Sequence, residues 1–160
     1  GAGIQADLKT FAALGAYGTT VITALTAQNT RGVTGVHAVP VAFVDQQLAT
    51  LVEDVRIDAV KIGMLASAEL VELVGSWLGR SPLADVPIVL DPVMVATAGS
   101  SLLESSAVAA LRQILPLASL ITPNLPEAAA LLGTDPARSV VEMREQAIAL
   151  LEATRADGGR

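Results

Sequence analysis

The sequence predicts an α/β fold with a parallel sheet. Three observations favour this class: short runs rich in Val, Ile and Thr, longer segments with helical periodicity, and alternation of the two along the chain. Runs that are apolar almost throughout are typical of strands covered on both faces of a parallel sheet. Strands that alternate with helices of this length indicate βαβ units with right-handed crossovers.

Four short runs are predicted to be the strands of this sheet. They lie at residues 19–25, 58–62, 86–90 and 118–122. The stretch after the first of them, residues 29–40, is flanked by Gly and Pro and is predicted to be a long loop. Long loops over a sheet often carry function.

Six helices are predicted from apolar residues that recur on one helical face. They begin near Ile4, Val41, Leu70, Val108, Asn124 and Ser139. In the first helix the shared face carries Ile4, Leu8 and Phe11. The last helix spans residues 139–153 and opens with a capping box of Ser139 and Glu142.

Composition excludes several classes of protein. Hydrophobic residues make up 52% of the chain, charged residues 16%, and the mean hydropathy is +0.56, which excludes a disordered, solvating chain. A net charge of −6 argues against binding to nucleic acid or to an anionic membrane. No apolar run approaches the roughly 20 residues that span a bilayer, and no secretory signal is visible. We therefore expect a soluble, cytoplasmic protein.

Cysteine and histidine usage excludes further chemistry. The chain has no cysteine, which removes disulfides, thiolate metal sites and a cysteine nucleophile. The single histidine, His37, cannot form a His-cluster zinc site and is expected in a solvated loop. Lys61 stands inside an apolar strand and is predicted to be a paired structural lysine or an edge residue.

Polar residues follow the predicted strands at the points where ligands bind in an open α/β sheet. The residues at these strand ends are Gln28, Asn29, Gly63, Met64, Asp91, Pro92, Pro123 and Asn124, with Glu127 one helical turn later. Carboxylates, amides and helix N-termini suit magnesium and phosphate better than acyl transfer.

Each of these residues also has a purely structural interpretation. Asn124 and Glu127 are good helix-start residues, with Asn as the N-cap and Glu at the third helical position. Asp91 before a proline would simply end a strand and open a turn. Gln28 would be a loop hydrogen-bonder, and Met64 would fill the core.

Four stretches together carry a family resemblance. They read GAGIQADLKTFAALGAYGTTVITALTAQNTRGV, VRIDAVKIGML, VLDPVMVATAG and LITPNLPEAAALLG. In this order and spacing they closely resemble hydroxymethylpyrimidine/phosphomethylpyrimidine kinases, the thiamine-biosynthesis enzymes of the ribokinase-like superfamily. The resemblance runs from Gly1 to about Leu151. It implies a ribokinase-like three-layer α/β/α sandwich with a mostly parallel central sheet.

The resemblance also implies an activity and a substrate pocket. The reaction is ATP-dependent phosphorylation of 4-amino-5-hydroxymethyl-2-methylpyrimidine and then of its monophosphate, in thiamine diphosphate biosynthesis. By resemblance, Gly3 and Asp7 line the pyrimidine pocket, Gln28 hydrogen-bonds the aminopyrimidine, and Met64 and Val93 contact the ring. An amide offers both a donor and an acceptor to such a ring, and apolar side chains cover its faces.

A second set of residues would serve the nucleotide. By resemblance, Asp91, Asn124 and Glu127 lie around Mg²⁺ and ATP. This agrees with the coordination preference of Mg²⁺, which usually keeps several water ligands and binds one or two protein carboxylates. Thr97 stands where some members have Lys, so the sequence departs from those members at a phosphate contact. The family also suggests a homodimer.

Some family motifs have no counterpart in this sequence. These are an upstream Gly-x-Asp-Pro-Ser-Gly segment, a Lys-Gly-Gly-His strand, and a Gly-Thr-Gly-Cys turn that supplies the anion hole and the base. We therefore expect residues 1–160 to be a partial kinase domain, truncated at both ends, in which no catalytic residue is assigned. A missing base costs roughly 10²–10⁴ in rate and missing anion-hole donors about 10²–10³, so little activity is expected of the chain alone.

Two other functions are compatible with the sequence. One is a pyridoxal kinase-like enzyme, although Gln28 and its QNTRGV context favour the pyrimidine. The other is a catalytically inert fragment that only binds the pyrimidine or associates with other chains.

Overall fold

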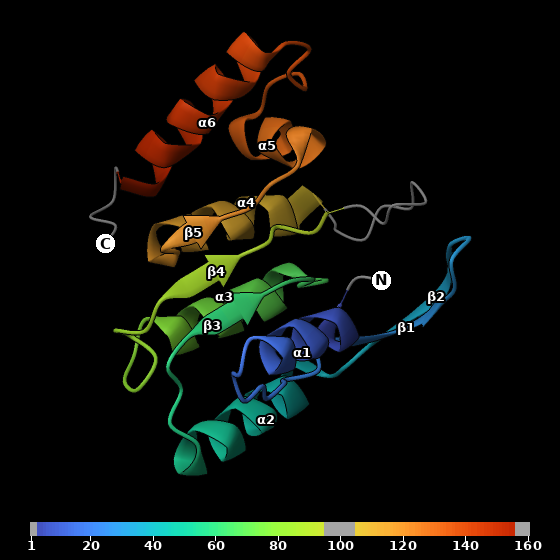
Figure 1. The fold of residues 1–160 in the computed structure, drawn as a ribbon, viewed down its shortest axis with the longest axis vertical. Coiled ribbons are helices and arrows are strands. Elements are labelled where there is room, and N and C mark those ends of the chain that lie inside the picture. Colours follow the sequence, from blue (N-terminus) through green and yellow to red (C-terminus); the bar gives the residue numbers. More distant parts are fainter. Residues whose placement is uncertain (1–2, 95–104, 156–160) are drawn as a thin grey trace.

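The computed structural model describes residues 3–94 and 105–155, and it confirms the α/β class (Figure 1). The strands are β1 (Ala24–Gln28), β2 (Val33–Ala38), β3 (Val60–Ile62), β4 (Ile88–Leu90) and β5 (Leu120–Ile121). The helices are α1 (Ile4–Ala13), α2 (Val41–Asp54), α3 (Ala68–Leu78), α4 (Ser105–Ile114), α5 (Leu125–Leu132) and α6 (Val140–Arg155), with a 3₁₀ turn η1 (Leu115–Leu117).

Strands β3, β4 and β5 form a parallel sheet in that order, with Val60 opposite Ile88 and Leu90 opposite Ile121. These are three of the four predicted strands, each shorter than its apolar run. A helix follows each strand, as the βαβ pattern requires.

The two faces of this sheet differ in burial. Side chains alternate along a strand, so Ile62, Ile88 and Leu90 share one face, and all three are almost fully buried. Helices α3 and α4 lie behind the sheet in Figure 1 and join the same hydrophobic core. Lys61 and Val89 point to the opposite face, where α1 contacts Lys61. Helices thus lie on both faces, as the three-layer fold class requires.

The first predicted strand is wrong in its position. Residues 19–23 belong to no strand, and β1 begins only at Ala24. The backbone of Ile22 is instead held by the side chain of Gln47 in α2, which accepts from the Ile22 N–H at 2.9 Å and donates to its carbonyl at 3.0 Å. An apolar, β-branched run becomes a strand only where a neighbouring strand completes its hydrogen bonds.

The predicted loop at residues 29–40 is also wrong, because half of it forms β2. Strands β1 and β2 pair antiparallel as a hairpin that extends away from the sheet (Figure 1). Its turn is closed by Asn29, whose side-chain oxygen accepts from the backbone N–H groups of Arg31 and Gly32. This local Asx hydrogen bonding folds the chain back on itself. His37 lies exposed in β2 rather than in a loop.

The predicted helices form, with two differences in detail. Helix α1 has no buried residue, and Ile4 on its predicted apolar face is 36% exposed. At the start of α6, Ser139 accepts from the Glu142 N–H as predicted, but the Glu142 carboxylate accepts from the Arg138 N–H instead of the Ser139 N–H. Within residues 3–94 and 105–155, no helix is both long and apolar enough to cross a membrane.

Candidate functional site

The candidate site begins where β3 and β4 end. The backbone N–H of Asp91 donates to the carbonyl of Ile62 at 2.9 Å, which continues the pairing of β3 and β4 by one residue. This bond fixes the Asp91 backbone at the carboxyl edge of the sheet. That edge is where ligands bind in open α/β sheets.

Three charged side chains meet beside this edge. The ammonium Nζ of Lys61 lies 3.1 Å from Oδ2 of Asp7 and 3.8 Å from Oδ2 of Asp91. Their side chains are between 26% and 35% exposed, so the cluster is half-buried. The prediction that Lys61 is a paired lysine is confirmed. Its central place between two candidate site residues was not predicted; the one signal was a cation inside an otherwise apolar strand.

Gly3 starts the helix that delivers Asp7 to this cluster. It is the N-cap of α1 with a φ of 84°, a conformation that glycine adopts without steric cost. Its carbonyl accepts from the N–H groups of Ala6 and Asp7 at 3.0 and 3.1 Å. The bend at Gly3 therefore sets the direction of α1.

The two predicted apolar contacts follow the same strand ends. Met64 comes two residues after β3 and Val93 three residues after β4, and both are half-buried. The Met64 carbonyl accepts from the hydroxyl of Thr23 at 2.9 Å, which joins this strand end to the segment before β1. Because β3 and β4 are parallel neighbours, the structure brings Met64 and Val93 to one edge together with Asp7 and Asp91.

Gln28 lies apart from this group. It is the last residue of β1, opposite Val33, at an irregularity in the hairpin, and it is exposed. Among residues 3–94 and 105–155, no hydrogen bond joins its side chain to another candidate site residue. The structure therefore does not bring Gln28 together with Asp7 and Asp91, and its predicted contact with a pyrimidine stays a prediction.

Asn124 and Glu127 form the start of α5. The Asn124 side chain accepts from the Glu127 N–H at 3.0 Å, and the Glu127 carboxylate accepts from the Asn124 N–H at 2.9 Å. This reciprocal pair is a complete capping box, and Glu127 is only 6% exposed. The structural interpretation of the pair is thus confirmed, while a role at the nucleotide stays a prediction.

The described acidic residues fit a magnesium ion that is bound together with a nucleotide, but they do not form a complete metal site of their own. Across the described ranges, no three Asp, Glu, His or Cys side chains gather closely enough to hold a metal. Magnesium bound with a nucleotide needs only one or two protein carboxylates, because phosphates and water complete its shell. Asp91 and Glu127 supply oxygen donors of that kind.

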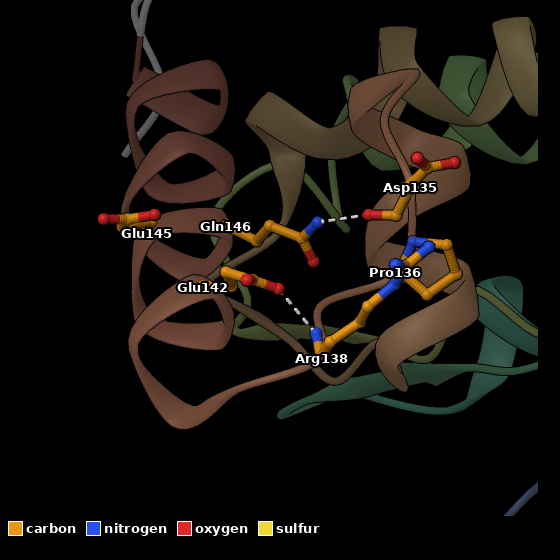
Figure 2. A pocket seen from close by; sticks show the side chains of 6 residues that line it. All are labelled: Asp135, Pro136, Arg138, Glu142, Glu145 and Gln146. Atoms are coloured by element: carbon orange, nitrogen blue, oxygen red, sulfur yellow. Dashed lines mark hydrogen bonds between the residues drawn. The ribbon is translucent and has the colours of Figure 1, made fainter.

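Figure 2 shows a hollow in the structure and the side chains that line it. It measures about 350 Å³ and is lined by the segment that joins α5 to α6 and by α6 itself, through Asp135, Pro136, Arg138, Glu142, Glu145 and Gln146. The amide nitrogen of Gln146 donates to the carbonyl of Asp135 at 2.7 Å, and the buried amide oxygen has no hydrogen-bond partner among the residues that the structure describes. None of the predicted site residues lines this hollow. Thr97, another predicted position, falls outside the described residues.

Comparison with known proteins assigns the chain to a family. A model of phosphomethylpyrimidine kinases matches residues 1–157. The chain belongs to the phosphomethylpyrimidine kinase family. The resemblance read from the four sequence stretches is therefore confirmed.

Relatives and solved structures agree with the family. The chain is 59% identical over 152 residues to the hydroxymethylpyrimidine/phosphomethylpyrimidine kinase of Escherichia coli, covering 94% of this chain and 56% of that enzyme. The crystal structure of a Clostridium difficile phosphomethylpyrimidine kinase superposes with a TM-score of 0.84 at 41% identity, covering 96% of this chain and 65% of that one. A Bacillus subtilis pyridoxal kinase, solved as an ADP complex, gives 0.83 at 37% identity, covering 96% and 58%. The fold is therefore that of the ribokinase-like kinases, and the chain spans about half the length of its E. coli relative.

Proposed function

We propose that the chain forms the pyrimidine-binding part, and some of the nucleotide-binding part, of a kinase that phosphorylates 4-amino-5-hydroxymethyl-2-methylpyrimidine and then its monophosphate in thiamine diphosphate biosynthesis. The observation that carries the proposal is the meeting of Asp7 and Asp91 beside Lys61 at the carboxyl edge of the sheet. Family membership supports the choice of substrate.

In this proposal the pyrimidine lies at the edge formed by the ends of β3 and β4. Met64 and Val93 would cover the faces of its ring, and Gly3 and Asp7 would line the pocket from α1. Gln28 would reach the ring from the hairpin, as amide donor and acceptor to the aminopyrimidine. Because Gln28 lies apart in the structure, this last contact requires the hairpin to close over the ligand.

The nucleotide would lie beyond Asp91 and the start of α5. Asp91 and Glu127 would hold Mg²⁺, mostly through water, and Asn124 would share this end of the site. Bound there, the ion would neutralise phosphate charge, which is the main electrostatic need of phosphoryl transfer. The N-terminus of α5 adds a positive end of a helix dipole on the same side.

No described residue is assigned as the general base or as an anion-hole donor. The contribution of residues 3–94 and 105–155 is therefore to bind, orient and balance charge. We expect the 160-residue chain by itself to bind the pyrimidine and to transfer phosphate slowly if at all.

The oligomeric state and the choice of substrate need separate tests. A homodimer is expected from the resemblance, and sedimentation equilibrium of the chain tests it. Pyridoxal as substrate is the enzyme alternative, since a pyridoxal kinase shares the fold at 37% identity. The higher identity of 59% to a hydroxymethylpyrimidine kinase favours the pyrimidine.

Titration calorimetry of the chain with hydroxymethylpyrimidine tests the binding part of the proposal. We expect saturable binding that Gln28→Ala weakens at least tenfold, or about 1.4 kcal/mol. Gln113→Ala is the matched control, because Gln113 is an exposed glutamine in α4. Binding that Gln28→Ala leaves unchanged would remove Gln28 from the pocket, and tighter binding of pyridoxal would favour the alternative substrate.

A chimeric enzyme tests the activity. The chain replaces the matching segment of the E. coli kinase, with which it shares 59% identity, so that the rest of that enzyme supplies the other parts of the site. We expect ATP-dependent phosphorylation of the pyrimidine. A folded chimera without activity would contradict the proposal and favour an inert pyrimidine-binding fragment.

A further inference from the structure

We propose that Lys61 is a positioning residue for the phosphoryl transfer, which holds the carboxylates of Asp7 and Asp91 in one fixed arrangement. This inference rests on the proposed function. Lys61 contacts Asp7 on the predicted pyrimidine side of the site and Asp91 on the predicted nucleotide side.

The geometry supports one cation shared by two anions. Nζ of Lys61 donates to Asp7 Oδ2 at 3.1 Å, a hydrogen-bonded ion pair, and lies 3.8 Å from Asp91 Oδ2. Two carboxylates this close to the same nitrogen would repel each other without it. All three side chains are roughly 30% exposed, so water screens the repulsion only in part.

The three residues come from separate elements. Lys61 lies in the middle of β3, Asp91 directly follows β4, and Asp7 lies in the first turn of α1. The backbone of the two strands is fixed by the parallel pairing, including the bond from Asp91 N–H to the Ile62 carbonyl. Because Lys61 lies on this paired backbone, its ammonium holds both carboxylates from a fixed position.

Helix α1 depends on this link more than the other helices do. It has no buried residue, so its packing against the core is weak. Within the described ranges, the bond from Lys61 to Asp7 is the one hydrogen bond between side chains that α1 makes. Since Gly3 is the N-cap of α1, loss of the lysine would displace both Gly3 and Asp7, the two pocket residues predicted at this end of the helix.

The ammonium of Lys61 lies close to Gly63, the residue after β3. A Cβ at Gly63 would lie 3.5 Å from the Lys61 Nζ, in van der Waals contact with the ammonium. The side chain therefore passes close over the backbone at the end of β3. This places the charge at the carboxyl edge of the sheet, although Lys61 itself lies one residue before the end of the strand.

Kinetics of the chimeric kinase test the role in transfer. Lys61→Met should lower kcat/KM by about 10²-fold, the cost of misplacing reacting groups by about 1 Å, with a raised KM for the pyrimidine. The Mg²⁺ concentration for half-maximal rate should fall, because Asp91 loses a competing cation. Lys61→Arg keeps the charge and should recover most of the loss.

Matched variants separate this role from simple stabilisation. Lys9→Met is the control, because Lys9 is an exposed lysine of α1. This substitution should leave kcat/KM, KM and the Mg²⁺ requirement unchanged. In an Asp7→Asn background, Lys61→Met should cost much less than in the parent, since the two residues act as a pair. A Lys61→Met enzyme that is merely less stable, with unchanged KM and Mg²⁺ requirement, would overturn the proposal.

Chemical labelling tests the ion cluster without any activity. Lys9 and Lys61 are the two lysines of the chain, so acetic anhydride followed by mass spectrometry compares them directly. Lys61 should react more slowly than Lys9, and Asp7→Asn should speed its reaction. Equal rates in the parent chain would refute the pairing itself. An inactive parent chimera with a protected Lys61 would instead count against the proposed function.

Discussion

The side chain of Gln47 makes both backbone hydrogen bonds of Ile22, at 2.9 and 3.0 Å. A primary amide can do this because it carries a donor and an acceptor side by side, as a peptide group does. Gln47 in α2 thereby takes the place of a neighbouring strand for the segment before β1. The contact joins residues 25 positions apart and ties the segment before β1 to α2.

Gln47→Ala should therefore lower the free energy of unfolding. Both polar groups of the part-buried Ile22 backbone would lose their partner, and we expect a loss of about 1–3 kcal/mol. Urea denaturation followed by circular dichroism measures it. Gln46→Ala is the matched control, because Gln46 is the exposed neighbour on the same helix. Equal midpoints for the two variants would contradict this role.

The only tryptophan of the chain, Trp77, reports on the packing of α2 against α3. Its indole Nε1 donates to Asp45 Oδ1 at 2.7 Å, and the guanidinium of Arg80 lies 3.8 Å from the ring centroid. Asp45→Ala should lower stability by about 1–2 kcal/mol and shift the fluorescence maximum. Glu53→Ala, an exposed acidic residue of α2, should change neither quantity. An unchanged spectrum in Asp45→Ala would show that the bond does not form in solution.

Gly75 allows α3 and α4 to approach closely. A Cβ at Gly75 would lie 2.6 Å from Cγ2 of Ile114, so Gly75→Ala forces either the Ile114 side chain or one of the two helices to shift. Overpacking of this kind costs typically about 1–3 kcal/mol, which should outweigh the gain in helix propensity. Gly79→Ala is the matched comparison, with an ordinary φ of −80° and its nearest contact at 3.6 Å. Thermal unfolding should separate the two, and a Gly75→Ala variant as stable as Gly79→Ala would disprove the close approach.

Two substitutions at Asn124 separate helix capping from nucleotide binding. Asn124→Ser keeps a good N-cap, whereas Asn124→Ala loses it and should cost about 1 kcal/mol. If Asn124 also serves the nucleotide, as proposed, both variants should raise the KM for ATP in the chimeric kinase. A stable Asn124→Ser enzyme with the parental KM would limit this residue to capping.

Much of the fold follows from local patterns in the sequence. The helices α2 to α6 and the strands β3 to β5 appear where apolar periodicity predicts them, because their core faces are encoded over a few turns. The capping box of Asn124 and Glu127 is equally local, since both partners lie within one helical turn. The family, too, could be recognised from four sequence stretches.

Other features depend on contacts between distant residues. Whether residues 19–23 become a strand depends on what lies beside them, and here the neighbour is Gln47. The pairing of Lys61 could be predicted from a charge in an apolar strand, but its partners could not. Asp7 lies 54 residues away and reaches Lys61 only through the packing of α1 on the sheet.

The sequence by itself determined the class, the helices, the caps and the family of this protein, because short-range periodicity and ordered motifs encode them. Only the tertiary structure decided the hairpin in place of the first predicted strand of the sheet, the separate position of Gln28, and the charge cluster at Lys61. Those features depend on which backbone edges and which charges meet in space, and hydrogen bonding and Coulomb attraction act over a few ångströms regardless of distance along the chain.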